Sequence, residues 1–150
     1  MLLCVGLCLR FNLMRYSGVT ATAIIFCPGN KILLIKRNTL PFRGFWALPG
    51  GKLEVGEIVE HTCVREVKEE VGVDVKIVCR IGEYHEFGDR EGVVYDYYPS
   101  CFVVMVVGGQ VVRQESEVQE VGLFGLDDLP CPLAFEHDKM ISDFRRMFNL

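Results

Sequence analysis

Residues 51–73 read GKLEVGEIVEHTCVREVKEEVGV, and this stretch decides how the rest of the chain is interpreted. Its apolar side chains recur at every fourth position, which is the spacing that puts them on one face of an α-helix. They are Val59, Cys63, Val67 and Val71. Glycine commonly ends a helix by adopting the left-handed conformation, and Gly72 follows the last of them. We therefore predict a helix over residues 58–71.

Three acidic residues of this helix fall on a single face. Glu66, Glu69 and Glu70 are spaced i, i+3 and i+4, so their carboxylates are neighbours and repel one another unless a positive charge lies between them. Ligands that are all hard, anionic oxygens suit Mg²⁺ or Mn²⁺ better than zinc. A solvated acidic helix face is the alternative explanation. The spacing favours a site for a divalent metal ion.

The residues around the acidic face fit such a site. Arg65 directly precedes it and can reach back to Glu57, and an arginine–carboxylate fork of this kind would fix the preceding loop against the helix. Gly50 and Gly51 come before that loop. Because glycine has no side chain, the backbone can approach closely there, and a backbone carbonyl could reach the same metal.

The whole stretch resembles the box motif of the Nudix hydrolases, and all of its fixed positions agree. The matching positions are Gly51, Glu57, Arg65, Glu66, aliphatic Val67, Glu69, Glu70, Gly72 and aliphatic Val73. The resemblance extends to a core of roughly residues 17–148. It implies an α/β fold, the Nudix α/β/α sandwich, with a mixed β-sheet between helices and the box as a loop–helix–loop.

The resemblance also implies roles for individual residues. Glu66, Glu69 and Glu70 match the metal ligands, often joined by the carbonyl of Gly50. Glu57, Arg65 and Gly51 match the residues that support the site. A further acid before the last strand often completes the metal site or acts as the base, and we rank Glu117 first, ahead of Glu115 and Glu120. The general base stays open among Glu66, Glu69 and Glu117.

The implied reaction is metal-dependent hydrolysis of a pyrophosphate bond in a nucleoside diphosphate linked to another group. The segments PFRGFWALPGG and LPCPLAFEHDKMI resemble those of ADP-ribose pyrophosphatases, so ADP-ribose is the expected substrate, cleaved to AMP and ribose 5-phosphate. Two alternatives remain. One is a MutT-type nucleoside triphosphate pyrophosphatase that removes oxidised nucleotides, and the other is a non-catalytic sensor of ADP-ribose or another nucleotide.

Basic and aromatic residues near the box are candidates for substrate contacts. Arg37 ends an expected strand where the family often keeps a cation that contacts phosphate, and Arg43 is a second candidate. Trp46, with Phe45 and the Tyr95–Tyr98 cluster, could stack on a base, although such aromatic residues more often pack in the core. His85 is expected in a loop near the site. His61 and His137 are expected at exposed helix positions.

The remaining elements follow from local patterns. Residues 18–26 and 31–37 flank the turn CPGN and predict a β-hairpin. Three further runs predict strands: 73–84, 94–107 and 117–125. Residues 133–148 carry apolar side chains at helical spacing, with Arg145 and Arg146 in the last turn, where cations suit the helix dipole.

Composition limits the remaining possibilities. The chain has 150 residues, which fits a single domain, and its first fifty residues carry six basic residues and no acid. No apolar run reaches 18 residues, so we expect no membrane partner, and the net negative charge argues against a nucleic-acid partner.

The seven cysteines lack the spacing of a metal site and indicate a protein of the reducing cytoplasm. We expect residues 1–13 to be an apolar extension or an extra strand. A homodimer is expected from the relatives, with a small nucleotide as substrate.

Overall fold

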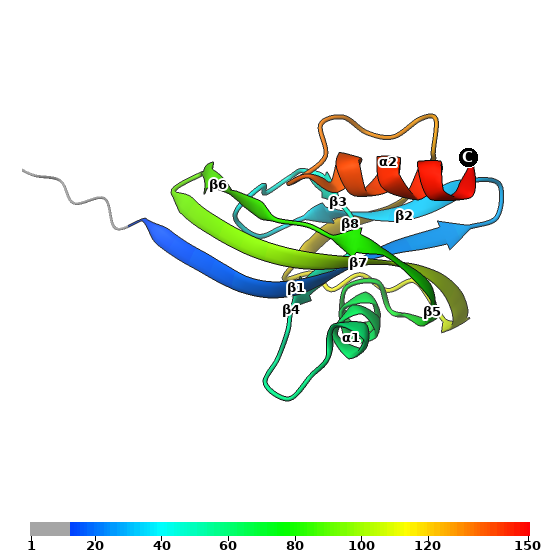
Figure 1. Cartoon of the computed structure of the whole chain (residues 1–150), viewed down its shortest axis with the longest axis horizontal. Helices are drawn as coiled ribbons and strands as arrows, with labels where there is room; N and C mark the ends of the chain where they lie inside the picture. The colour runs from blue at the N-terminus through cyan, green and yellow to red at the C-terminus, as the bar shows by residue number, and fades with distance from the viewer. Residues whose placement is uncertain (1–12) are drawn as a thin grey trace, which may run out of the picture.

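A computed structural model describes residues 13–150 and shows one twisted sheet with a helix on each side (Figure 1). Its elements are β1 (Met14–Cys27), β2 (Lys31–Arg37), β3 (Trp46–Ala47), β4 (Gly50–Lys52), α1 (Val59–Val71), β5 (Val73–Glu83), β6 (Glu86–Arg90), β7 (Val93–Gly109), β8 (Val118–Gly125) and α2 (His137–Phe148). The prediction for the N-terminal segment 1–13 falls almost entirely outside the described residues.

The eight strands form a mixed sheet. Its main path runs β3-β2-β1-β7-β5, while β4 joins β1, β6 joins β7 and β8 joins β2. The central pair, β1 and β7, is parallel, and the other pairs are antiparallel. In Figure 1, α1 lies below the sheet and α2 above it. The predicted sandwich, with a mixed sheet between helices, is confirmed.

Alternation along the central strands builds a core on each face of the sheet. Ala23 and Ile25 of β1 are fully buried in the same cluster as Val67 of α1. Ile24 points to the opposite face and is buried in the cluster that holds Phe144 of α2. Because successive side chains of a strand point to opposite faces, one apolar run supplies both cores.

The predicted helix of the box is confirmed and the C-terminal helix is shorter than predicted. Gly72 ends α1 with φ 87°, and its N–H donates to the carbonyl of Lys68, 3.0 Å away. The second helix was expected over residues 133–148 but begins at His137. Residues before it are held by β3 instead, since the Ala134 N–H donates to the Trp46 carbonyl at 2.8 Å.

The strands 94–107 and 18–26 are longer than their sequence patterns predicted, and three strands, β3, β4 and β6, were not predicted at all. β1 begins at Met14 because it pairs with β7 from Val93 onward. The segment around His85 was expected to be a loop, but residues Glu86–Arg90 form β6 and pair with β7. This segment contains Gly88 and several charged residues, so its sequence lacks the apolar alternation that predicts a strand.

The surface and the cysteines agree with a folded domain that needs no disulfide. Within residues 13–150 neither helix has the length and apolarity needed to cross a membrane. The five cysteines of that range are free thiols; Cys63 and Cys101 are buried, whereas Cys131 is exposed.

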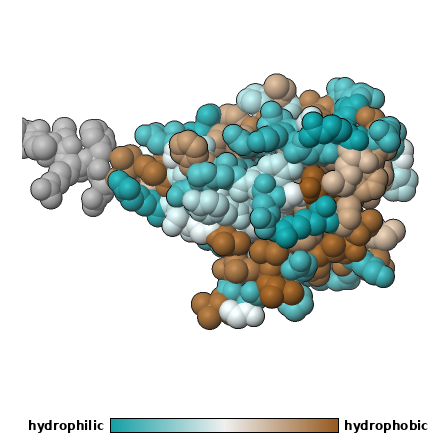
Figure 2. Space-filling model, in the orientation of Figure 1, coloured by the Kyte–Doolittle hydropathy of each residue, from teal (hydrophilic) through white to brown (hydrophobic). Residues whose placement is uncertain are grey.

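Figure 2 shows hydrophobic residues gathered on the lower side of the molecule. The loop before α1, which lies on this side in Figure 1, exposes Val55 and Ile58.

Replacing Phe144 by alanine is expected to destabilise the fold strongly. Phe144 is 1% exposed and fills the space between α2 and the sheet, so its loss leaves a cavity that costs about 3–5 kcal/mol. Phe148, on the same helix, is 43% exposed, and Phe148→Ala should cost clearly less. Urea unfolding followed by circular dichroism measures both free energies. Equal losses for the two variants would contradict this account of the α2 core.

Candidate active site

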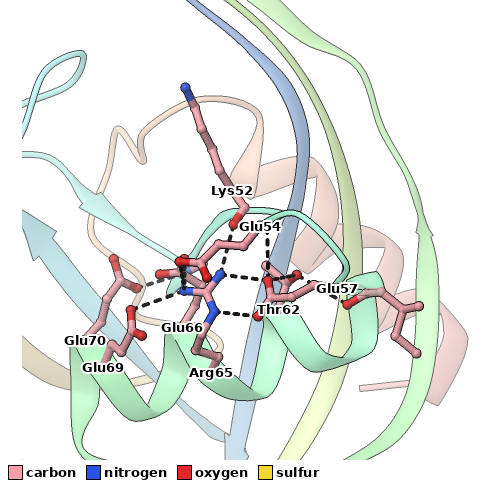
Figure 3. Close-up of polar contacts among 10 residues, drawn as sticks. Lys52, Glu54, Glu57, Thr62, Arg65, Glu66, Glu69 and Glu70 are labelled. Carbon is pink, nitrogen blue, oxygen red and sulfur yellow. Dashed lines mark hydrogen bonds and ion pairs between the residues drawn. The ribbon is translucent and has the colours of Figure 1, made fainter.

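Arg65 forms the predicted fork with Glu57. Its Nε donates to Glu57 Oε1 at 2.7 Å and its NH2 group donates to Glu57 Oε2 at 3.0 Å. The NH2 group also donates to the carbonyl of Lys52, 3.0 Å away (Figure 3). Since Lys52 ends β4, Glu57 lies on the loop between β4 and α1, and Arg65 lies within α1, one guanidinium fixes that loop to the helix.

Glu57 is itself the organising acceptor of the loop. Its Oε2 accepts a hydrogen bond from the Thr62 hydroxyl at 2.8 Å and one from the Glu54 N–H at 3.0 Å. The hydrogen bonds from Arg65, with those from Glu54 and Thr62, lower the pKa of Glu57 to about 2. Glu57 therefore carries its negative charge throughout the neutral and mildly acidic pH range.

The same guanidinium also contacts the acidic face of α1. The NH1 group of Arg65 donates to Glu66 Oε1 at 2.8 Å and to Glu69 Oε2 at 3.2 Å (Figure 3). The carboxylates on both sides raise the pKa of Arg65 above its usual value. Arg65 is therefore the positive charge that the sequence required among the acidic residues of this helix.

Two of the α1 carboxylates lie in the interior. Glu66 is 8% exposed and Glu70 is 4% exposed. Glu66 packs directly on Gly51, where an added Cβ would lie 2.6 Å from Glu66 Oε2, so a side chain at Gly51 would collide with the carboxylate. Glu70 Oε2 accepts a hydrogen bond from the Gly50 N–H at 2.9 Å. The two glycines thus serve to bring the β4 backbone against the carboxylates.

Burial makes these two carboxylates costly to ionise in the free protein. Desolvation raises the pKa of Glu66, and the hydrogen bonds from Arg65 only partly oppose it. Desolvation and the nearby charges of Glu66 and Glu117 raise the pKa of Glu70 to about 8. The hydrogen bond from the Gly50 N–H and the charge of Arg37 lower this pKa, but only in part. The site therefore holds more acidic groups than its own cations neutralise.

These residues open into a cavity of about 290 Å³ that is lined by residues of the sheet, of α1 and of several loops. Gly50, Gly51, Glu66 and Glu70 line one end of the cavity, and Glu117 comes to the same space from the loop before β8. This volume is near the lower end of small-molecule pockets, roughly 300–1,000 Å³. The structure thus brings the box and the predicted downstream acid Glu117 to one cavity.

The donor set at this end of the cavity fits a divalent metal ion. Every candidate ligand is an oxygen, and Glu66 and Glu70 are buried carboxylates close to each other and to Glu117, so a hard cation would offset their charge. Within residues 13–150 no three acidic side chains converge on one point, because Glu66 and Glu69 turn to Arg65. Glu66, Glu70 and the carbonyl of Gly50, all from residues that line the cavity, would hold the metal together with Glu69, which lies on the same helix beside Arg65 but does not line the cavity.

Arg37 lies inside the same cavity with part of its guanidinium free. Nε donates to the Pro41 carbonyl at 3.0 Å and NH2 donates to the Thr39 hydroxyl at 3.2 Å, which leaves NH1 without a partner among the described residues. The carbon of the guanidinium lies 5.0 Å from the centre of the Phe135 ring. Arg37 is therefore a fixed cation that faces the cavity next to the acidic end.

The other predicted substrate contacts have different surroundings. Arg43 is exposed and donates to Asn38 Oδ1 at 3.2 Å, away from the cavity wall. Trp46 packs edge-to-face on Phe124, with ring centres 4.8 Å apart, and belongs to the α2 core. Of the aromatic candidates, Tyr97 alone lines the cavity.

Sequence reasoning missed two residues of the cavity and misjudged one of them. His137 was expected to be exposed but is 5% exposed, because its Nδ1 accepts a hydrogen bond from the Leu48 N–H at 2.9 Å. Glu86 is 4% exposed and lines the cavity beside it. No local signal in the sequence indicates either position, since both depend on contacts between distant segments. His61 is exposed, as predicted.

The comparisons with known proteins agree with this geometry. A family model described as NUDIX domain matches residues 17–144. The chain is 40% identical over 141 residues to an ADP-ribose pyrophosphatase of Methanocaldococcus jannaschii, which covers 93% of this chain and 80% of that protein. It is 29% identical over 127 residues to a putative 8-oxo-dGTP diphosphatase of Bacillus subtilis, covering 83% of this chain and 78% of that protein. The crystal structure of a MutT NUDIX hydrolase from Burkholderia pseudomallei superposes with a TM-score of 0.76 at 29% identity, over 85% of this chain and 97% of that one.

Replacing Arg65 by lysine is expected to loosen the loop before α1. A lysine ammonium cannot form the fork, so Glu57 would lose the paired charge-assisted hydrogen bonds that it accepts from Arg65. Hydrogen exchange should therefore speed up at the Glu54 amide, which is bonded to Glu57. Arg80→Lys is the matched control, since Arg80 pairs with the exposed Glu83. Unchanged protection of the Glu54 amide in Arg65→Lys would argue against the fork as the anchor of the loop.

Proposed function

The chain belongs to the Nudix family and is a Nudix hydrolase, and we propose that it hydrolyses ADP-ribose to AMP and ribose 5-phosphate. The observation that carries the proposal is the cavity that Glu66 and Glu70 of the box line together with Arg37 and Glu117. The 40% identical relative from Methanocaldococcus jannaschii, an ADP-ribose pyrophosphatase, supports this choice of substrate.

The proposed reaction adds water across the pyrophosphate bond. The water oxygen forms a new bond to one phosphorus, the bridging oxygen leaves with the other phosphate, and the proton of the water passes to a carboxylate. A divalent cation held by Glu66, Glu69 and Glu70 would offset phosphate charge and lower the pKa of the attacking water. The cavity residues supply the remaining part, which is positioning and charge.

Arg37 is suited to bind a phosphate oxygen in this reaction. Its Nε and NH2 groups are held by Pro41 and Thr39, so the free NH1 group has a defined direction. A guanidinium that is already held loses little freedom when it binds an anion. Burial lowers the pKa of Arg37, yet it stays charged because arginine does not lose its proton in proteins.

Glu117 is our candidate for the general base, with Glu66 and Glu69 as the other candidates. Glu117 is exposed, lines the cavity, and is close enough to Glu66 and Glu70 to influence the pKa of both. Its position is fixed by the backbone, since the Asn38 N–H donates to the Glu117 carbonyl at 2.8 Å. This contact adjoins the β2–β8 pair of Arg37 with Val118, so Glu117 immediately precedes β8 beside Arg37.

Three further points belong to the proposal. The metal is Mg²⁺ or Mn²⁺, because every donor at the acidic end of the cavity is an oxygen. The homodimer and the cytoplasmic location stay predictions of the sequence. Sedimentation analysis of the purified protein would decide between a dimer and a monomer.

A substrate panel tests the proposed function directly. With Mg²⁺ and ADP-ribose, we expect AMP and ribose 5-phosphate in equal amounts, and none of either after the metal is removed with EDTA. Release of pyrophosphate from 8-oxo-dGTP with no cleavage of ADP-ribose would favour the MutT-type alternative. Tight binding of ADP-ribose without turnover would favour the sensor. Chromatography of the products, with Mg²⁺ and Mn²⁺ compared, separates these outcomes.

Replacing Glu117 by glutamine is expected to lower kcat by about 10²–10⁴-fold, which is the usual contribution of a general base. Glu115→Gln is the matched control, because Glu115 lies on the same loop but pairs with Arg113 outside the cavity. Its kcat should stay within about twofold of the unmodified protein, as expected for a surface change. A near-normal kcat for Glu117→Gln would transfer the role of base to Glu66 or Glu69.

A further inference from the structure

The cavity has a second pair of ionisable side chains that the proposed chemistry does not use. Glu86, on β6, and His137, the first residue of α2, line the same cavity as the box carboxylates, and both side chains are buried. Residues of this kind are seldom buried without a partner. Their surroundings therefore indicate what the cavity is built to bind.

The hydrogen bonds of His137 fix the role of each ring nitrogen. Nδ1 accepts the Leu48 N–H at 2.9 Å, so Nδ1 carries no proton and the neutral ring bears its proton on Nε2. Burial and the nearby charge of Arg37 lower the pKa of His137 to about 3, which keeps the ring neutral. His137 therefore presents an Nε2–H donor.

That donor and the Glu86 carboxylate are not satisfied by each other. His137 Nε2 lies 3.7 Å from Glu86 Oε1, which is longer than a hydrogen bond. Oε1 accepts one long hydrogen bond, at 3.4 Å, from the Glu136 N–H, and Oε2 has no partner among the described residues. No fully enclosed side-chain polar atom in residues 13–150 lacks a partner, so the free atoms of this pair retain access to the cavity.

The charges around Glu86 do not compensate the free-energy cost of burying its ionised carboxylate. Desolvation and the charge of Glu136 raise the pKa of Glu86 to about 7, and the Glu136 N–H and Arg37 only partly oppose this. A ligand that donates hydrogen bonds to the carboxylate would supply the missing stabilisation, since an ionised carboxylate accepts hydrogen bonds and donates none.

The neighbouring rings argue for a hydroxylated ligand and against a stacked base. The centre of the Phe135 ring lies 5.0 Å from the Arg37 guanidinium carbon and 4.6 Å from the centre of the Phe42 ring. The centre of the Tyr97 ring lies 5.4 Å from the Lys52 ammonium nitrogen and 6.2 Å from the centre of the Tyr95 ring. Both rings are thus engaged within the protein, and the small cavity has room for only part of a dinucleotide-sized substrate.

We propose that Glu86 and His137 form a subsite for the vicinal hydroxyls of the sugar phosphate half of the substrate. Glu86 accepts hydrogen bonds from two neighbouring hydroxyls, and His137 Nε2 donates to one of them. Carboxylates bind ribose hydroxyls in this way in other nucleotide sites. The proposal rests on the proposed function, because the acidic end of the cavity and Arg37 then hold the adjoining phosphate.

The test compares two sugar phosphates that differ by a single hydroxyl. Binding of ribose 5-phosphate and of 2-deoxyribose 5-phosphate is measured by calorimetry on the full chain with Mg²⁺, which requires no turnover. We expect the ribose compound to bind about tenfold more tightly, as for one hydrogen bond to a charged group. In Glu86→Gln the ratio should fall to within about twofold, through weaker binding of ribose 5-phosphate.

Two controls keep the result interpretable. Glu83→Gln removes an exposed carboxylate just before β6 and should leave the tenfold ratio unchanged. Glu86→Asp keeps the charge but shortens the reach, and should lower the ratio to between those of Glu86→Gln and the unmodified protein. It also serves as the test if Glu86→Gln does not fold, as judged by circular dichroism.

Several outcomes would overturn the subsite. Equal binding of the two sugar phosphates by the unmodified protein, or no binding of either, would do so. So would an unchanged ratio in Glu86→Gln, or a hydroxyl preference found only for AMP over 2′-deoxy-AMP, which would put the nucleoside in the cavity. Failure to hydrolyse ADP-ribose alongside an intact, Glu86-dependent ratio would reject the proposed substrate and leave the subsite standing.

Discussion

The arrangement of this site depends on one guanidinium. Arg65 holds Glu57, the Lys52 carbonyl, Glu66 and Glu69 at the same time, which joins the loop before α1 to the acidic face of the helix. Lysine could not do the same, because the planar fork of arginine offers donors in fixed directions. Without this charge the carboxylates of α1 would repel one another and the loop would lose its anchor. The rest of the cavity is assembled around that fixed helix.

The cavity contains two groups of ionisable side chains and one cation that is close to both. Glu66 and Glu70 of the box with Glu117 form the first group, and Glu86 with His137 forms the second. Arg37 is influenced by the charges of Glu70 and Glu117 from the first group and of Glu86 from the second. An anionic substrate that carries hydroxyl groups would find a site for a metal, a cation and a hydrogen-bond acceptor in this one cavity. The acid-free first fifty residues contribute to this arrangement mainly through Arg37.

What the sequence predicted well is local. The helix over 58–71, its glycine cap and the Arg65–Glu57 fork follow from spacings within one segment, and the structure shows all three. What it missed depends on pairing between distant segments. β6 is ordered by β7, which sets Glu86 opposite Tyr97, and His137 is buried because the Leu48 N–H needs an acceptor. Trp46 illustrates the same limit, since no local pattern distinguishes a ring packed on Phe124 from one that faces a cavity.

The parallel pairing of β1 with β7 has a consequence for synthesis of the protein. Met14 pairs with Val93 and Ile25 with Val104, so the first strand waits for its central partner until most of the chain has left the ribosome. His137 follows later still. Because contacts that are distant in sequence form slowly, the early strands stay exposed during translation while the cavity cannot yet close. A truncated nascent chain that ends before α2 would carry the complete box and still lack one wall of the binding site.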